Sequence, residues 1–346
     1  MSSVFWRLSG PSLFLGSLIL RVQKGTSLVI SAEMATVFDV STRIADVLRE
    51  NGVSVTFLEA GLLPIKAVSR DRNCSEDHPS LDDICDSCHG ICCMIVDVVE
   101  PENANLWSQF LRRLQHRARQ NGESNRPVII VVHRCPWPGD GAFDDVAITQ
   151  LSFNDALSRA DIVSLAHSLL PTRGISKVLR KVLVHTVASI SLTDLDLLTH
   201  VASESLSEMT VPFDSLLTWA RNQGFSRDSA DLPRMYLEGE VLEHSVALAL
   251  RGDRAGINRR IWAAQAGILL PWVEEERSKL VPELKAWLPK EHEGQIMQEF
   301  EVGTLDFLIS RGSAPASLKN RTRLLRDIRN NLAHCGIISY SCLRAL

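Results

Sequence analysis

Short apolar runs alternate with amphipathic segments along the first 145 residues of the chain. Residues 27–31 (SLVIS) have the length and composition of a buried strand, and three more runs repeat this pattern, at 53–58, 91–99 and 127–132. Between these runs, apolar positions recur every three or four residues over 37–51 and 103–119, which predicts two helices. Strands that alternate with helices predict an α/β domain whose parallel sheet is covered on both faces.

Beyond residue 150 the pattern becomes helical. The predicted helices lie at 151–157, 162–170, 175–189, 194–206, 213–223, 258–281, 296–310 and 318–334. The segments 68–90 and 134–145 are polar or rich in Pro and Gly, and we expect them to be loops. The fold class expected is therefore an α/β domain at 1–145, followed by an all-α middle region at 146–244 and a helical domain at 245–346.

The overall charge gives little help in finding a partner. The chain has 346 residues, of which 45% are hydrophobic and 23% charged, as in ordinary globular proteins. Its formal net charge is -4 and its pI about 6.2, so no global basic field steers it to nucleic acid. This disfavours a protein that coats DNA, but it is compatible with an enzyme that holds RNA briefly in a local basic patch.

The N-terminal segment and the cysteines bear on localisation. Residues 11–20 are apolar and follow Arg7, which resembles the core of a secretory signal, but Arg21 and Lys24 follow without a clear cleavage site. We expect an N-terminal helix packed on the first domain. No apolar run reaches the roughly 18 residues that span a bilayer, so no membrane contact is expected. Eight cysteines are too few for a disulfide scaffold and indicate a cytoplasmic protein with mostly free thiols.

One cluster of possible metal ligands precedes the third predicted strand. It comprises Cys74, His78, Cys85, Cys88 and His89. The spacing Cys85-x-x-Cys88 occurs in zinc knuckles, and the string CDSCH matches the attachment motif of c-type haem. A second clean pair is missing, because Cys92 and Cys93 fit the strand better. We therefore expect a loop with free thiols and no metal.

The order of strand, loop, helix and strand, followed by the strands CCMIVD and VIIVV, resembles the core of P-loop NTPases of the AAA or STAND kind. In that comparison Asp97 stands where the Walker B acid ends its strand. The loop after the first strand, residues 32–39 (AEMATVFD), has none of the GxxxxGK[ST] residues that enclose phosphates, and the string KGTS at 24–27 precedes the strand. We therefore expect a P-loop-like domain without a Walker A motif, without ATPase activity and without a cofactor. Asp97 is then a carboxylate at the end of a strand and not a magnesium ligand.

The last predicted helix carries the most specific motif. The string Arg329-Asn330-Asn331-Leu332-Ala333-His334 matches RNxxxH and lies at the end of an amphipathic helix. This motif and the long amphipathic helix at 258–281 resemble HEPN domains, and the resemblance covers about residues 245–346. It implies catalytic roles for Arg329, Asn330 and His334, with no metal and no cofactor.

HEPN nucleases are taken to cut RNA by attack of the ribose 2′-hydroxyl on the adjacent phosphate. In that scheme His334 moves the proton as base or acid, Arg329 stabilises the phosphorane with its forked donors, and Asn330 orients its neighbours. The 2′-hydroxyl requirement implies RNA and not DNA as the substrate. Family members pair their motif helices across a two-fold axis, which implies a homodimer.

Other charged and aromatic residues of the last domain have less specific roles. We expect Glu276 and Arg277 on a solvated helix face, although such charges sometimes line the HEPN groove. Trp262, Trp272 and Trp287 are expected to be core anchors or dimer contacts, in preference to base-stacking platforms.

The sequence thus predicts a cytoplasmic HEPN endoribonuclease of a bacterial defence or toxin-like system. The alternative is a catalytically inactive HEPN adaptor that dimerises and regulates or recruits a partner ATPase or another protein of the system. A third hypothesis is a nucleotide-binding switch that uses the α/β domain without a P-loop.

Overall fold

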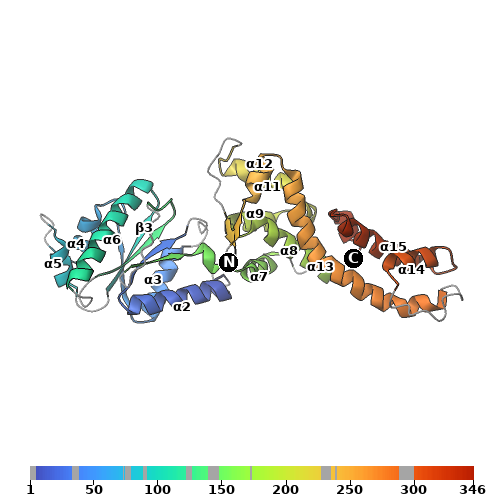
Figure 1. Ribbon diagram of the computed structural model, residues 1–346, viewed down its shortest axis with the longest axis horizontal. Coiled ribbons are helices and arrows are strands. Elements are labelled where there is room, and N and C mark those ends of the chain that lie inside the picture. Colours follow the sequence, from blue (N-terminus) through green and yellow to red (C-terminus); the bar gives the residue numbers. More distant parts are fainter. Residues whose placement is uncertain are drawn as a thin grey trace. The chain divides into compact units, whose positions relative to one another are not determined.

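The computed structural model describes residues 5–32, 39–72, 74, 79–88, 92–121, 127–138, 148–171, 174–226, 235–237, 240–287 and 300–346. The chain divides into two compact units (Figure 1). The first consists of Met1–Ile162 with the short segments Thr193–Asp196 and Tyr236–Val241. The second consists of Val163–Leu192, Leu197–Met235 and Leu242–Leu346. No helix within the described residues is long and apolar enough to pass through a membrane.

The first unit contains a five-stranded parallel sheet, as the alternating pattern predicts. Its strands are β1 (Ser27–Ser31), β2 (Ser54–Leu58), β3 (Cys92–Val98), β4 (Val128–His133) and β5 (Ile148–Ser152). They lie side by side in the order β2-β3-β4-β1-β5, and all four neighbouring pairs are parallel. The central strands are buried on both faces, which explains why they are continuous apolar runs in the sequence.

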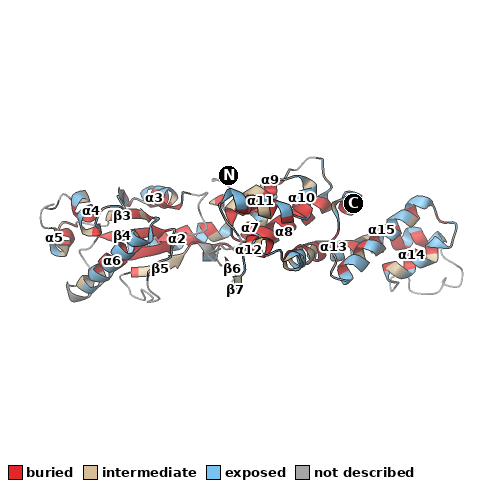
Figure 2. Cartoon of the chain, turned by 90° about the horizontal axis from the view of Figure 1, so that it is seen from above, coloured by how far each residue is buried: buried red, intermediate tan, exposed pale blue. Residues whose placement is uncertain are grey.

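Helices cover both faces of this sheet. They are α2 (Ser9–Gln23), α3 (Val40–Glu50), α4 (Pro64–Asp71), α5 (Leu81–Asp86) and α6 (Pro101–Asn121). One core joins Val29, Met94 and Ile129 of the strands to residues of α4, α5 and α6, including the fully buried Trp107. The alternate strand residues, such as Leu28 and Ile95, point to the opposite face and are equally buried. Figure 2 shows the central strands coloured as buried.

Two predictions for this unit are wrong. The sequence predicts a helix at 151–157, yet Ile148–Ser152 pairs with β1 as a fifth strand, with Ile30 opposite Leu151. Pairing with an existing sheet edge overrides the weak local helix signal. The segment 68–90 was expected to be a loop, but it contains the end of α4 and the short helix α5, which Ser80 caps through the amide of Asp83.

The second unit is mainly helical. Its elements are α7 (Arg159–Leu169), α8 (Lys177–Ser191), α9 (Leu195–Ser203), α10 (Leu206–Thr210), α11 (Phe213–Asn222), α12 (Ser245–Leu250), α13 (Arg254–Leu284), the 3-10 turn η2 (Lys285–Trp287), α14 (Val302–Ser310), α15 (Ala316–Ala333) and α16 (Tyr340–Leu343). Two short strands, β6 (Met235–Leu237) and β7 (Glu240–Leu242), pair with each other, and most of their residues belong to the first unit. The region 146–244 is therefore not all-α. The boundary between this region and the last helical domain stays a prediction.

The last part of the second unit is a helical group built on α13. This helix continues through Pro271 and Pro282, and α15 packs against both α13 and α14 (Figure 1). The predicted helix at 296–310 is confirmed from Val302 onward, and residues 288–299 lie outside the described part of the chain. These contacts fix the helix that carries the RNxxxH string.

Candidate active site on helix α15

Helix α15 is amphipathic, and its apolar stripe holds it in place. Leu318, Leu325, Ile328 and Leu332 are buried at spacings of three to seven residues, with Thr322 buried between them. The opposite face is polar and exposed (Figure 2). Burial of four apolar side chains therefore orients α15, while the polar face stays open to solvent.

The motif histidine lies at the end of this helix. His334 is the C-cap residue, and Cys335 after it takes a left-handed conformation with φ 57°. The amide of Cys335 donates to the carbonyl of Leu332 (3.1 Å), and the amide of Gly336 donates to that of Asn331 (2.8 Å). This is the hydrogen-bond pattern of a Schellman motif, which turns the chain sharply away from the helix. The imidazole is exposed at this corner.

Two side chains of α13 attach the end of α15 and the segment after it. The indole of Trp262 donates to the carbonyl of Leu332 at 2.7 Å. The amide of Gln265, which is completely buried, donates to the carbonyl of Ile338 (3.1 Å) and accepts from its N–H (2.6 Å). These three bonds fix the turn on both sides of His334. Trp262 thus acts as an intramolecular anchor, one of the two roles expected for it, whereas Trp287 is 38% exposed.

Arg329 is held by a carboxylate of its own chain. Its Nη2 lies 2.9 Å from Oε2 of Glu301, the N-cap residue of α14. The Arg329 side chain is 37% exposed and that of Glu301 is 64% exposed, so solvent screens this pair and can separate it. One turn earlier, Arg326 pairs with Asp306 and Asp327, which strengthens the link between α15 and α14.

The structure does not bring Arg329 and His334 together within one chain. Five residues of helix separate them by about 140° around the axis. Arg329 faces α14, whereas Asn330 and His334 lie on the exposed face, where no described residue bonds to either side chain. A site that uses both Arg329 and His334 therefore requires a further contribution, from a second copy of the chain or from the substrate.

Sequence reasoning missed a residue on the same exposed face. Arg323 lies two helical turns before Asn330 and three before His334, and all three positions fall within about 40° of one another around α15. The signal was present in the sequence, because separations of seven and eleven residues return to one face of a helix.

Glu276 and Arg277 do not lie on a solvated face, so that expectation is wrong. Arg277 pairs with Glu274 at 2.7 Å and donates to the carbonyl of Phe300 at 3.1 Å. Glu276 accepts from Arg321 of α15 at 2.7 Å, and this bond outweighs burial in holding the pKa of Glu276 below its usual value. Both side chains therefore connect α13 to neighbouring segments.

A second polar centre lies at the carboxyl ends of the strands in the first unit. The hydroxyl of Ser41, in the first turn of α3, donates to Oδ1 of Asp97 near the end of β3 at 2.5 Å. Asp39 caps α3 by accepting from the amide of Thr42 at 2.9 Å. The amino end of a helix attracts phosphate, but here a carboxylate of the chain already occupies it. Residues 33–38 of the loop after β1, which is predicted to lack a Walker A motif, lie outside the described residues.

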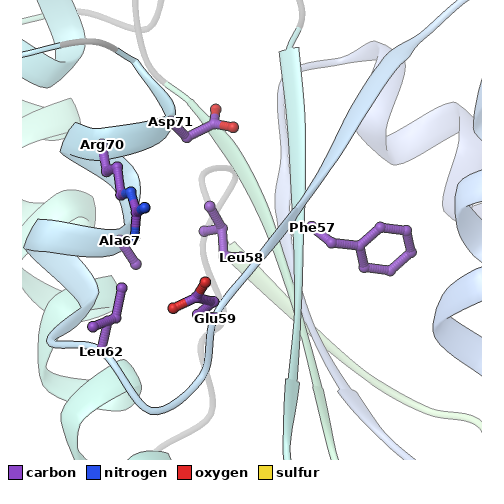
Figure 3. A pocket seen from close by; sticks show the side chains of 7 residues that line it. All are labelled: Phe57, Leu58, Glu59, Leu62, Ala67, Arg70 and Asp71. Atoms are coloured by element: carbon purple, nitrogen blue, oxygen red, sulfur yellow. The ribbon is translucent and has the colours of Figure 1, made fainter.

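A shallow pocket of about 210 Å³ lies beside the carboxyl end of β2, against α4. Figure 3 shows Arg70, Leu62 and Glu59 around this space, with Phe57 directed away across the strand. The lining mixes one guanidinium with two carboxylates, and Asp71 already pairs with Arg72 at 3.5 Å. The pocket includes neither Ser41 nor Asp97, so it is separate from that polar centre.

The cysteine cluster holds no metal-binding group among the residues that the structure describes. His78 and His89 lie outside them. All eight cysteines are free thiols, and burial raises the pKa of Cys88 to about 11. Arg72 donates to the sulfur of Cys92, so this guanidinium is engaged within the fold.

No protein-family model matches the chain, and no curated protein is significantly similar to it.

Proposed function

We propose that the chain is a metal-independent HEPN endoribonuclease whose site includes Arg329, Asn330 and His334. The observation that carries the proposal is the placement of Asn330 and His334. Both side chains are exposed at the end of a well-anchored helix, and no described residue forms a hydrogen bond with either of them. Polar groups that are fixed in position yet unpaired are the groups available to a substrate.

The chemistry follows from the residue types. Histidine exchanges protons near neutral pH, so His334 takes the proton of the ribose 2′-hydroxyl or gives one to the leaving 5′-oxygen. Attack of the 2′-oxygen on the adjacent phosphorus breaks the bond to the 5′-oxygen and leaves a 2′,3′-cyclic phosphate. Arg329 supplies a fixed positive charge with forked donors for the phosphorane, and Asn330 orients its neighbours.

Because Arg329 and His334 point about 140° apart on one helix, we propose that two chains complete the site. A second copy would place its own motif helix beside the carboxyl end of α15, so that a two-fold axis relates the motifs and the face with Arg323 stays open. In this arrangement Arg329 of one chain and His334 of the other serve the same phosphate. The substrate is RNA, and the protein acts within a bacterial defence or toxin-like system.

An inactive adaptor is the second candidate, and one contact favours it. Glu301 neutralises Arg329 in the same way that a substrate phosphate would. If this pair persists in the dimer, the motif helix serves for dimerisation and for recruitment of a partner such as an ATPase. RNA cleavage separates the two candidates.

For the α/β unit we propose a P-loop-like core that has lost nucleotide binding. The strand order β2-β3-β4-β1-β5 and the placement of Asp97 at the end of β3 beside Ser41 support this relationship. The loss of nucleotide binding is supported by the Asp39 cap on α3 and by the missing glycines and lysine. This unit then senses or binds something other than ATP.

The test is cleavage of labelled total RNA and tRNA in buffer with a chelator. Wild type is compared with His334→Ala, Arg329→Ala and Asn330→Ala, and Asn331→Ala serves as the matched control because it is the exposed neighbour of Asn330. We expect wild type and Asn331→Ala to cut and to leave cyclic phosphate ends, and the three motif variants to lose cutting. Absence of cutting by a folded wild type would favour the adaptor.

A further inference from the structure

Helix α15 is strongly basic, and neighbouring groups engage most of its cations. It carries five basic residues and one acidic residue, Asp327. The engaged basic residues and their partners are Lys319 with the carbonyls of Ser310 and Gly312, Arg321 with Glu276, Arg326 with Asp306 and Asp327, and Arg329 with Glu301. These contacts direct four of the five cations toward α13, α14 or the turn between α14 and α15.

Arg323 is the exception among the five. Its side chain is exposed, and no described residue forms an ion pair or hydrogen bond with it. The nearest acid on its face is Asp327, one turn further along, and Arg326 already donates to that carboxylate at 2.6 and 3.0 Å. Arg323 thus presents an uncompensated positive charge to solvent, where an anionic ligand can reach it without breaking an existing pair.

The position of this charge relates it to the proposed site. Arg323, Asn330 and His334 share one face of α15, and Arg323 lies about 16 Å from His334 along the helix axis. This distance is too long for both side chains to reach one phosphate. It suits a polyanion that lies along the helix, with one phosphate at His334 and another at Arg323.

We propose that Arg323 binds a phosphate of the RNA strand remote from the scissile one, and so positions single-stranded RNA along α15. The inference rests on the proposed ribonuclease function and adds a substrate requirement to it. Efficient substrates must extend over several nucleotides on one side of the cut. Because a phosphate contact carries no base information, Arg323 contributes affinity and register but no sequence preference.

The size of the effect follows from counterion release. One phosphate contact on single-stranded nucleic acid changes the slope of log K against log salt by about 0.7, which corresponds to about fourfold in affinity near 0.15 M salt. Arg323→Ala should therefore raise KM for a ten-nucleotide RNA about fourfold, leave kcat unchanged, and flatten the salt dependence of binding by about 0.7. Arg323→Lys keeps the charge and should behave as wild type.

The experiment compares two substrates in the full-length chain. A ten-nucleotide RNA carries the remote phosphate, whereas a dinucleoside monophosphate has only the scissile one. Arg323→Ala should impair cleavage of the first and leave cleavage of the second unchanged. Arg70→Ala is the matched control, because Arg70 is also exposed and without a described partner but lies on α4 of the first unit. Thermal unfolding confirms that each variant is folded.

Binding of a 2′-O-methyl ten-nucleotide RNA, which cannot be cleaved by this route, separates this inference from the nuclease proposal. One outcome is that wild type binds this RNA with a salt slope that depends on Arg323 and yet fails to cleave unmodified RNA. In that case the ribonuclease proposal fails and the phosphate site stands. If cleavage requires His334 but Arg323→Ala matches Arg70→Ala in KM and salt slope, the phosphate-site inference is overturned and the ribonuclease proposal stands. An equal loss with the dinucleoside monophosphate, or binding of polyglutamate in place of RNA, would also overturn it.

Discussion

Arg329 and Glu301 form an ion pair with 2.9 Å between Nη2 and Oε2, in which a carboxylate occupies the place proposed for a phosphate. The pair links α15 to the N-cap residue of α14, and both side chains are partly exposed. Such pairs contribute little to stability, so a phosphate can displace Glu301 at small cost. In the proposed ribonuclease, this contact would lower the affinity for RNA without abolishing it.

Removal of this carboxylate should increase activity. Glu301→Gln frees the Arg329 guanidinium for phosphate, and we expect RNA affinity and kcat/KM to rise about two- to fivefold, the range that a partly exposed ion pair allows. Cleavage rates and fluorescence anisotropy with a short RNA measure the change. Glu283→Gln is the matched control, since it removes an equal charge from a pair with Arg321 at 3.7 Å. A loss of activity in Glu301→Gln would show that Glu301 positions Arg329 and does not compete with RNA.

The turn after His334 predicts opposite effects of two neighbouring glycine substitutions. Cys335 has φ 57°, a conformation that costs most L-residues roughly 1 kcal/mol and glycine nothing, so Cys335→Gly should raise the unfolding temperature. Ala333→Gly, two residues earlier within α15, should lower it, because glycine costs about 1 kcal/mol in a helix. Differential scanning fluorimetry of both variants checks the signs. A lower unfolding temperature for Cys335→Gly would contradict the left-handed assignment.

Gln265 should be required for order at the carboxyl end of the chain. Gln265→Leu leaves the N–H and the carbonyl of Ile338 without partners, at about 1–3 kcal/mol for each unsatisfied group. We expect faster hydrogen exchange at Ile338 and weaker RNA cleavage, because the turn that holds His334 loosens. Gln223→Leu, on the exposed end of α11, should change neither. Unchanged protection of Ile338 in Gln265→Leu would mean that this pair of bonds does not hold the segment.

Asp161 should give the first unit a specific acid sensitivity. Burial by itself raises the pKa of this carboxyl, but hydrogen bonds from Ser158, Gly10 and Ser9 outweigh it and hold the pKa below its ordinary value. The stabilisation is therefore complete above the unfolded pKa of about 3.9 and is lost as pH falls through the lower folded pKa. Thermal unfolding of wild type and Asp161→Asn should differ most near neutral pH and converge in acid. A difference that grows in acid would contradict this account, and Asp155→Asn serves as the exposed control.

Magnesium and ATP should leave the unfolding temperature of the chain unchanged. Asp39 already caps α3, and the loop before it lacks the lysine and glycines that hold phosphates. A ligand at one hundred times its Kd would stabilise the folded state by about 2.7 kcal/mol, which thermal shift assays detect readily. A clear upward shift with ATP would support the nucleotide-binding switch instead.

The sequence predicts the elements whose signal is local. The four apolar runs of the sheet and the stripe on α15 are visible because every buried position shows in the residue pattern. The sequence does not predict β5, because its residues ITQLS carry little strand signal. Pairing with β1 holds this segment as a strand. The contact between Arg329 and Glu301 joins residues 28 positions apart in different helices, so no motif spacing could reveal it. Helical periodicity could predict that Arg323 shares a face with Asn330 and His334. It could not predict that Arg323 has no described partner, because this depends on which groups the other four cations of α15 contact.

The most direct test of a ribonuclease site built from Arg329 and His334 is to mix two inactive variants. Arg329→Ala and His334→Ala are each assayed alone and after joint refolding, with a short labelled RNA and a chelator. If the two residues act on one phosphate from different chains, the mixture contains dimers with one intact site and recovers metal-independent cleavage. If wild type does not cut RNA, or if either variant alone cuts as well as wild type, the ribonuclease account is contradicted.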